Sequence, residues 1–360
     1  MIIGVPSEVK NNENRVGLTP DSARKIVASG HDVLIQKDAG ANIGFFDEQY
    51  LSAGAKILDS GEDVYKSSEM IVKVKEPIPE EYPFLRDDLT LFTYLHLAGD
   101  PENAKKLIDT GVTGIAYETV TAADGSMPLL APMSTIAGQL AIVVGSYHLL
   151  KHNKGKGVMI GKLDSIEPRV VTVIGAGVAG TQSISKALDN HALVKVLDTS
   201  ESKLQQLESE FGSSNIEYIL STSDSVQSAI NESDMVIGSV YVVGKEAPKV
   251  VSRDMLKSMN PGTVMVDVSI DQGGCFESSR PTTHDNPTFL ENDIVHYCVT
   301  NMPGAVPLTA TQALNKVTLS YIEDLANKGV ENALIDDEHL RNGLNIQNGE
   351  ITHPAVKDAL

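Results

Sequence analysis

One run of sequence constrains the fold of this chain more than any other. A strand-like apolar stretch at 169–174 leads directly into three glycines spaced as Gly-x-Gly-x-x-Gly, at 175–180. A helix-length stretch follows, and then a second apolar stretch that ends in a carboxylate, Asp198. This order of strand, glycine turn, helix, strand and acid is typical of a parallel α/β unit that binds a dinucleotide. The run therefore predicts a nucleotide-binding domain of the Rossmann type.

Each part of this run has a mechanical reason. Gly175 permits the tight turn, Gly177 lets the backbone approach a pyrophosphate, and Gly180 lets helix and strand pack closely. The helix that begins near Val178 directs its unpaired N–H groups and the positive end of its dipole at the phosphates. Asp198 can then accept hydrogen bonds from the adenosine ribose. The alternative, a structural glycine turn without a ligand, is disfavoured by the acid at the end of the second strand.

Composition limits the remaining possibilities. A chain of 360 residues is long for one core, so we expect two domains. The net charge of −19 argues against nucleic acid or an anionic membrane as a partner and fits a cytoplasmic enzyme. Cys275 and Cys298 form no zinc or disulfide pattern, so no metal is expected. The N-terminus lacks the apolar region of a signal peptide, and no stretch approaches the roughly 18 apolar residues of a membrane helix.

Strand and helix patterns alternate along the whole chain, which favours parallel sheets. The sequence predicts α/β architecture with a nucleotide-binding domain (131–305) inserted into a discontinuous substrate domain (1–130 and 306–360). A helical stretch at 134–151 carries small residues at a spacing that suits close packing at a subunit or domain contact. Strands are expected at 2–5, 31–36, 70–75, 90–96, 114–118, 235–237, 263–268 and 294–299, and further helices near 20–29, from 101, and at 309–328.

Four polar residues fall at predicted strand ends, where open α/β sheets bind ligands. Arg15 lies in the loop after the first strand, Lys75 and His96 close two later strands, and Asp271 follows another. Taken singly, Arg15 could form a surface salt bridge and Lys75 could be a solvated strand end. Likewise, His96 could be a hydrogen-bonded core residue, and Asp271 could be a helix cap or a turn residue.

The occurrence of all four polar residues at strand ends indicates a catalytic site. Two cations suit a substrate carboxylate and its neighbouring carbonyl, while a histidine and an aspartate suit proton transfer near neutral pH. Together with a dinucleotide site, this set predicts hydride transfer on a small amino or hydroxy acid. Spacing alone does not choose between those two substrates.

The sequence also closely resembles the alanine dehydrogenases, within the wider group that includes the soluble subunit of the pyridine-nucleotide transhydrogenase. Leu308 and Gln139 depart from the expected pattern, because Arg or Lys is usual at the first position and Arg at the second. These departures put in doubt any family salt bridge near a domain junction or subunit contact. The matching stretches span nearly the whole chain, at 3–20, 71–77, 91–97, 130–134, 266–275, 279–283 and 296–306.

The resemblance implies two Rossmann-like domains closing on a substrate. It also implies that Arg15 and Lys75 bind the substrate carboxylate and carbonyl, and that His96 and Asp271 are the acid–base residues. NAD would be contacted, besides the three glycines, by Ser134, Val178, Ala179, Asp198, Lys203, Ser221, Val240, Tyr241, Val268, Ser269, Ile270, Asp271, Arg280, Val299, Thr300, Asn301 and Met302.

The expected activity is reversible oxidative deamination of L-alanine to pyruvate and ammonium, with hydride transfer to NAD, as part of amino-acid catabolism in the cytoplasm. The resemblance also implies a homo-hexamer. Two alternatives remain. One is a transhydrogenase-type NAD(H)-binding subunit, which needs a membrane partner. The other is a non-catalytic NAD-binding regulatory module.

Overall fold

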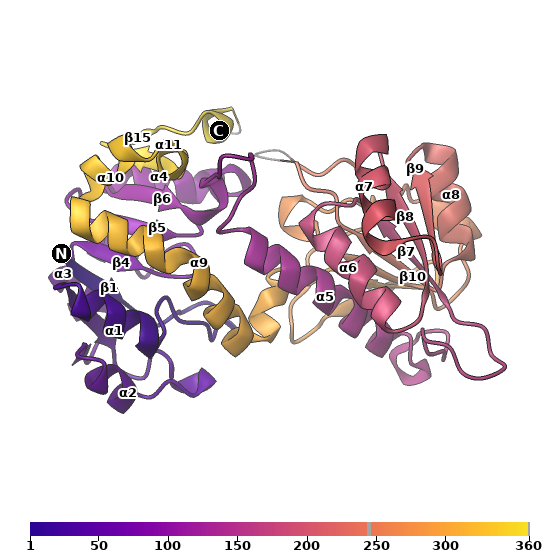
Figure 1. Ribbon diagram of the computed structural model, residues 1–360, viewed down its shortest axis with the longest axis horizontal. Helices are drawn as coiled ribbons and strands as arrows, with labels where there is room; N and C mark the ends of the chain where they lie inside the picture. Colours follow the sequence, from indigo (N-terminus) through magenta and orange to yellow (C-terminus); the bar gives the residue numbers. More distant parts are fainter. Residues whose placement is uncertain (243–245, 359–360) are drawn as a thin grey trace. The chain divides into compact units, whose positions relative to one another are not determined.

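The computed structural model describes residues 1–242 and 246–358. Backbone contacts divide the chain into two compact units, residues 1–133 with 304–360 (unit 1) and residues 134–303 (unit 2). Figure 1 shows that the yellow C-terminal helices of unit 1 lie beside its indigo and purple N-terminal elements. Each unit is built on its own largely parallel sheet, which confirms the α/β class and the two-domain Rossmann-like architecture.

Unit 1 has an eight-stranded sheet in the order β15-β14-β6-β5-β4-β1-β2-β3. Six strands are parallel, and the C-terminal pair adds an antiparallel edge. The strands are β1 (Ile2–Val5), β2 (Asp32–Gln36), β3 (Lys56–Leu58), β4 (Met70–Val72), β5 (Thr90–Thr93), β6 (Thr113–Ala116), β14 (Leu344–Gln347) and β15 (Glu350–Ile351). The helices are α1 (Pro20–Ala28), α2 (Asp47–Ser52), α3 (Gly61–Ser67), α4 (Pro101–Thr110), α9 (Pro307–Lys328), α10 (Val330–Asp336), α11 (Glu338–Arg341) and α12 (Pro354–Lys357).

Helix α9 closes unit 1 through polar contacts with the loop after β1. The Asn315 side chain accepts from the Thr19 N–H at 2.8 Å and donates to the Gly17 carbonyl at 3.1 Å. Thr311 accepts from the Val16 N–H at 3.2 Å. Thr19 also caps α1, with Pro20 at the first helical position, as the sequence predicts. Helix α9 therefore fixes the loop that leads from β1 into α1.

Unit 2 has a seven-stranded sheet in the order β12-β13-β11-β10-β7-β8-β9, in which only β12 is antiparallel. The strands are β7 (Val170–Ile174), β8 (Leu193–Asp198), β9 (Ile216–Leu220), β10 (Met235–Gly238), β11 (Val264–Asp267), β12 (Thr288–Glu291) and β13 (Ile294–Tyr297). The helices are α5 (Ala131–His148), α6 (Val178–Asp189), α7 (Glu201–Phe211) and α8 (Ser223–Glu232).

The small residues of α5 face elements of unit 2 itself. A Cβ on Gly138 would lie 2.1 Å from the Ala179 carbonyl oxygen of α6, and a Cβ on Gly145 would lie 2.6 Å from the Met235 sulfur of β10. The close packing predicted for this helix is therefore present, but for these two glycines it occurs inside one unit. For these two glycines the contact lies within unit 2 in place of the predicted domain contact, and the subunit contact stays a prediction.

Two of the predicted strands end three residues early in the structure. The strand expected at 70–75 ends at Val72, and the strand expected at 90–96 ends at Thr93. The backbone at His96 adopts the left-handed conformation, with φ of 51°. Buried residues thus continue past the last regular strand residue, and Lys75 and His96 lie on short segments beyond the sheet.

No helix in the described part of the chain is both long and apolar enough to cross a lipid bilayer.

Candidate active site

Three of the four predicted catalytic and substrate-binding residues gather in unit 1. Arg15 follows β1, Lys75 follows β4 and His96 follows β5, and these three parallel strands are neighbours in the sheet. Their carboxyl ends share one edge, so the three side chains lie near one another. Lys75 and Arg15 both lie close enough to lower the pKa of His96. Asp271 belongs to unit 2.

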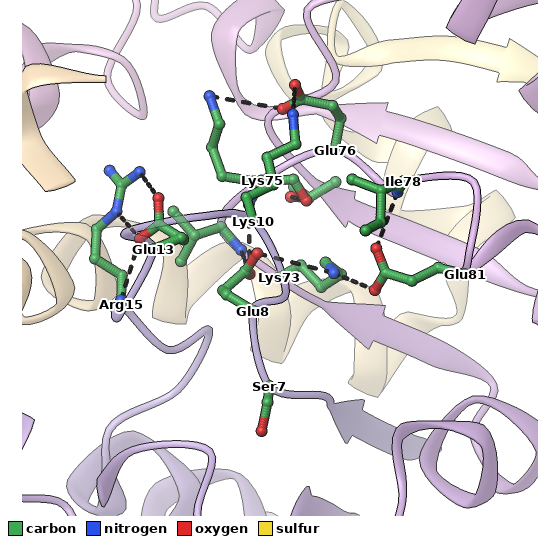
Figure 2. A network of polar contacts seen from close by, with 12 residues as sticks. Ser7, Glu8, Lys10, Glu13, Arg15, Lys73, Lys75, Glu76, Ile78 and Glu81 are labelled. Atoms are coloured by element: carbon green, nitrogen blue, oxygen red, sulfur yellow. Dashed lines mark hydrogen bonds and ion pairs between the residues drawn. The ribbon is translucent and has the colours of Figure 1, made fainter. Parts of the chain in front are cut away.

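Arg15 is held by a carboxylate of its own loop. The side chain is 2% exposed, and its Nε and Nη2 donate to the two oxygens of Glu13 at 2.7 and 2.5 Å (Figure 2). The Arg15 backbone N–H donates to the same carboxylate at 3.1 Å, and Nη1 donates to the Met133 sulfur at 3.3 Å. This bidentate pair fixes the plane of the guanidinium. Burial rules out the alternative of a surface salt bridge.

Lys75 belongs to a cluster of charges that the sequence did not predict. Its Nζ lies 3.6 Å from Glu76, and Lys10 donates to the other oxygen of that carboxylate (Figure 2). Burial opposes ionisation of Glu76, but Lys75, His96 and Lys10 outweigh it and lower the pKa to about 2. Glu76 is therefore charged at neutral pH. With its side chain 15% exposed, Lys75 is not the solvated strand end of the alternative interpretation.

His96 is neutral at physiological pH. Burial, and then the positive charge of Lys75, lowers the pKa of the imidazole to about 4. The ring is partly buried and stacks against Tyr94, with ring centroids 5.8 Å apart. The Tyr94 hydroxyl is fixed in turn by donation to the Leu129 carbonyl at 2.6 Å. A neutral imidazole has one ring nitrogen that can accept a hydrogen bond or a proton.

The glycine loop of unit 2 has the geometry that each glycine was predicted to provide. Gly175 has φ of 92°, in the left-handed region. A Cβ on Gly180 would lie 1.9 Å from the Gly175 carbonyl oxygen, whereas a Cβ on Gly177 would meet no atom within 4 Å. Helix α6 begins at Val178, and Gly177 at its N-cap supplies no side chain to its first N–H groups. The loop thus leaves an open approach to a helix N-terminus, which suits a phosphate.

Asp198 ends β8 and faces this loop. One carboxylate oxygen accepts from the Ala176 N–H at 2.8 Å, and the other accepts from the Ser200 N–H at 2.8 Å. Each carboxylate oxygen has a second acceptor position, so both can also receive hydroxyl groups of a ribose. The carboxylate therefore joins the strand end to the glycine loop and still suits its predicted role.

Asp271 is exposed in a short 3-10 turn, Ile270–Gln272, just beyond β11. The loop that carries it is closed by the buried carboxylate of Asp267. One oxygen of Asp267 accepts from the Ser269 N–H at 3.0 Å, and the other accepts from the Cys275 N–H at 2.9 Å. The turn interpretation of Asp271 thus agrees with the structure and does not exclude the catalytic one.

The remaining residues expected to contact the cofactor lie mostly beyond the carboxyl ends of unit 2 strands. Several of them do not directly follow a strand. The Arg280 guanidinium stacks over the Phe289 ring, 4.1 Å from its centroid, and Lys203 lies on α7. Ser134 lies on α5, and Val178 and Ala179 begin α6. The strand-end group comprises Ser221 after β9, Val240 and Tyr241 after β10, Val268, Ser269 and Ile270 after β11, and Val299, Thr300, Asn301 and Met302 after β13.

The two departures from the family pattern lie at exposed positions. Gln139 on α5 donates to Gln182 on α6 at 3.1 Å, so a neutral hydrogen bond links these helices within unit 2. Leu308, in the first turn of α9, is 42% exposed.

Comparison with known proteins gives concordant results over the whole chain. The family model described as "Alanine dehydrogenase/PNT, N-terminal domain" matches residues 4–137, and the corresponding C-terminal domain model matches residues 141–354. The alanine dehydrogenase of Halomonas elongata is 48% identical over 359 residues, covering 100% of this chain and 96% of the relative.

Solved structures agree with these matches. A structure described as L-alanine dehydrogenase superimposes with a TM-score of 0.95 at 46% identity, covering 100% of this chain and 99% of that one. A transhydrogenase from Sinorhizobium meliloti gives a TM-score of 0.83 at 24% identity, covering 99% of this chain and 100% of that one, a similarity that concerns the fold alone.

Proposed function

The chain belongs to the alanine dehydrogenase/PNT family, and from this premise we propose that it is an NAD-dependent L-alanine dehydrogenase. The enzyme would oxidatively deaminate L-alanine to pyruvate and ammonium and catalyse the reverse amination. The observation that carries the proposal is the gathering of Arg15, Lys75 and His96 beyond three neighbouring strands of unit 1. Two fixed cations and a neutral histidine are the groups that a small amino acid and its proton transfers require.

The residues of unit 2 fit the cofactor. The open space at Gly177 and the uncapped start of α6 suit a pyrophosphate, and Asp198 suits the adenosine ribose. A bulkier residue at Gly177 would fill that approach. When bound, NAD supplies a hydride acceptor for the substrate Cα, which is chemistry that no side chain provides.

In this mechanism the side chains of unit 1 orient the substrate. Arg15 is fixed by Glu13 and binds the substrate carboxylate, and Lys75 binds the carboxylate or the neighbouring carbonyl. Oxidation at Cα leaves an iminium carbon that water attacks. One proton of that water passes either to a ring nitrogen of His96, which is neutral because its pKa is lowered, or to the carboxylate of Asp271. The same group returns that proton to the nitrogen. The C–N bond then breaks as the added hydroxyl oxygen forms the C=O bond of pyruvate, and the hydroxyl proton passes to the departing ammonia, which leaves as ammonium.

The transhydrogenase alternative is less well supported. Hydride exchange between two nicotinamides needs neither a carboxylate-binding pair of cations nor an acid–base histidine. The chain has both Arg15 and Lys75, together with His96, at one sheet edge. A non-catalytic NAD-binding module would likewise leave these residues without a role.

One assay separates the three functions. The purified chain is incubated with NAD and L-alanine while NADH absorbance is followed, with D-alanine as the stereochemical control. An alanine dehydrogenase reduces NAD with the L-isomer only. Hydride transfer between NADH and a nicotinamide analogue without alanine would indicate the transhydrogenase function. NADH binding without turnover would indicate the non-catalytic NAD-binding module.

Assembly and cellular role are part of the same proposal. We propose a homo-hexamer that acts in the cytoplasm in amino-acid catabolism, producing pyruvate from alanine. The family to which the chain belongs supports this assignment, as does the acidic net charge of −19. Multi-angle light scattering of the purified protein gives the assembly directly, and a particle of any other subunit number would contradict the hexamer.

A further inference from the structure

The two segments that carry Lys75 and His96 leave the sheet before those residues are reached. The ladder between β4 and β5 extends only as far as Lys73 N–H to Phe92 O and Tyr94 N–H to Val74 O, both at 3.3 Å. Backbone N–H groups beyond this point need other partners, because an unpaired N–H away from water is costly. For both segments the partner is a glutamate from a flanking strand.

Beyond β5, the side chain of Glu118 accepts the backbone N–H groups that the ladder leaves unpaired. Its Oε1 accepts from the His96 N–H at 2.6 Å and from the Leu95 N–H at 3.2 Å, and its Oε2 lies 3.3 Å from the Leu95 nitrogen. His96 sits in the left-handed region, where a residue with a side chain is disfavoured. The carboxyl oxygens of Glu118 satisfy the two N–H groups that the ladder leaves unpaired, so this side chain can hold the conformation.

Beyond β4, the side chain of Glu8 accepts the backbone N–H groups in the same way. Its side chain is 1% exposed, and its Oε1 accepts from the Val74 N–H at 2.7 Å and more weakly from the Lys75 N–H at 3.4 Å. Lys73 lies between Glu8 and Glu81, with its Nζ 3.8 Å from Glu8 and bonded to Glu81 (Figure 2). The lysine thus partly neutralises the buried carboxylate without competing for the oxygen that binds the backbone.

The two glutamates occupy equivalent places in the fold. Glu8 follows β1, which flanks β4, and Glu118 follows β6, which flanks β5, in the sheet order β6-β5-β4-β1. Each outer strand therefore supplies one carboxylate to the segment beyond its inner neighbour. In this way side chains extend the hydrogen bonding of the sheet to each functional residue, His96 or Lys75, and to the residue before it.

We propose that Glu118 and Glu8 are positioning residues that aim His96 and Lys75 by accepting their backbone N–H groups. The functional part of this inference rests on the proposed alanine dehydrogenase activity, in which His96 moves protons and Lys75 binds substrate. The structural part, that the carboxylates hold these two segments, is independent of the reaction.

The test for Glu118 uses three substitutions. Glu118→Ala removes the acceptor, Glu118→Asp keeps the charge but shortens the reach, and Glu118→Gln keeps the reach but removes the charge. We expect kcat for alanine oxidation to fall at least about 10-fold in the Ala and Asp variants, because small misplacements of a catalytic group are costly. The Gln variant should recover to within about 3-fold of wild type, since its amide oxygen still accepts from His96. NADH affinity should not change.

Glu8 gives a different kinetic signature. Because Lys75 binds substrate, Glu8→Ala should raise the KM for alanine and pyruvate at least about 5-fold, with a smaller effect on kcat. Glu8→Gln should stay near wild type. A matched control is Asn345→Ala, which removes a buried side chain bonded to Thr119 and Gly343 but not to either segment. This control should lower thermal stability and leave both kcat and KM unchanged.

A second measurement does not depend on turnover. Amide hydrogen exchange, followed by mass spectrometry on peptides covering 73–76 and 94–97, should accelerate in the Ala variant of the corresponding glutamate and not in Asn345→Ala. If wild type lacks alanine dehydrogenase activity, the proposed function fails while exchange still decides whether the carboxylates hold the segments. If Glu118→Ala does not fold, Glu118→Asp carries the same comparison. Wild-type exchange together with wild-type kinetics in the Ala or Asp variant overturns the proposal.

Discussion

The glycine loop offers a matched pair of substitutions that separates cofactor binding from folding. Gly177→Ala places its methyl where no atom lies within 4 Å, and Gly177 has φ of −65°, which alanine adopts readily. Alanine is a poorer N-cap than glycine by roughly 0.5–1 kcal/mol, but it restricts the unfolded chain by about 0.4–1 kcal/mol, so the two effects nearly cancel. We therefore expect thermal stability to change by no more than about 3 °C.

Its effect on the cofactor should be large. The methyl occupies the approach through which a pyrophosphate reaches the start of α6, so the Kd for NADH should rise at least about tenfold, or roughly 1.4 kcal/mol. Gly180→Ala is the counterpart, because its Cβ would lie 1.9 Å from a backbone carbonyl and must displace it. That overpacking costs about 3 kcal/mol, which lowers Tm by roughly 6–12 °C.

Fluorescence titration with NADH and thermal unfolding by circular dichroism measure both quantities on the same samples. The comparison depends on Gly177→Ala losing affinity while keeping its stability. A Gly177→Ala protein that folds and binds NADH as tightly as wild type would refute the assignment of this loop to the pyrophosphate.

The other predictions concern the catalytic and charged residues. His96→Ala should lower turnover by about 10²–10⁴-fold with unchanged NADH affinity, and near-wild-type turnover would remove His96 from the mechanism. Arg15→Lys should raise the KM for alanine and pyruvate, because lysine lacks the planar fork that Glu13 holds in place, and unchanged kinetics would make Arg15 structural. Asp198 should give NAD at least about a tenfold preference over NADP in kcat/KM, since a 2′-phosphate would be repelled by this carboxylate, and equal efficiency with both cofactors would contradict its role. Burial raises the pKa of Glu118 from 4.5 to about 7, so the native state holds this proton more tightly than the unfolded chain and wild type loses stability as the pH rises through that range. The Gln side chain of Glu118→Gln does not titrate. Between the lower and the upper end of that pH range, the free energy of unfolding of this variant should therefore rise by about 2–3 kcal/mol relative to that of wild type, as measured by urea unfolding.

Much of the fold was predictable because its determinants are local. The spacing of Gly175, Gly177 and Gly180 encodes a turn, an approach and a helix contact within six residues, and the structure has each of these features. Parallel strands also place their carboxyl ends along one edge of a sheet. That rule predicts from sequence that Arg15, Lys75 and His96 come together from three separate segments.

The carboxylates around these residues could not be predicted in the same way. Glu8 pairs with a backbone 66 residues away, and Glu118 with one 22 residues away. Sequence alone describes each as one acid among 48. Only the strand order, in which β1 flanks β4 and β6 flanks β5, brings them to their partners. Glu76 was equally hidden, although its position directly after Lys75 and before a proline was a usable signal.

The error at the strand ends has the same cause. Apolar residues continue through Val74 and Leu95 because these side chains are buried, so the hydrophobic pattern cannot mark where the backbone ladder stops. A ladder that continued through His96 would keep its backbone extended and exclude the left-handed turn seen there. The chain must therefore leave the sheet while staying rigid, and a carboxylate from the flanking strand meets both requirements. The pKa of Glu118 is raised because burial disfavours the charged carboxylate, so this arrangement costs folding free energy. In exchange, we expect the backbone of the catalytic histidine to be as well fixed as that of a strand residue.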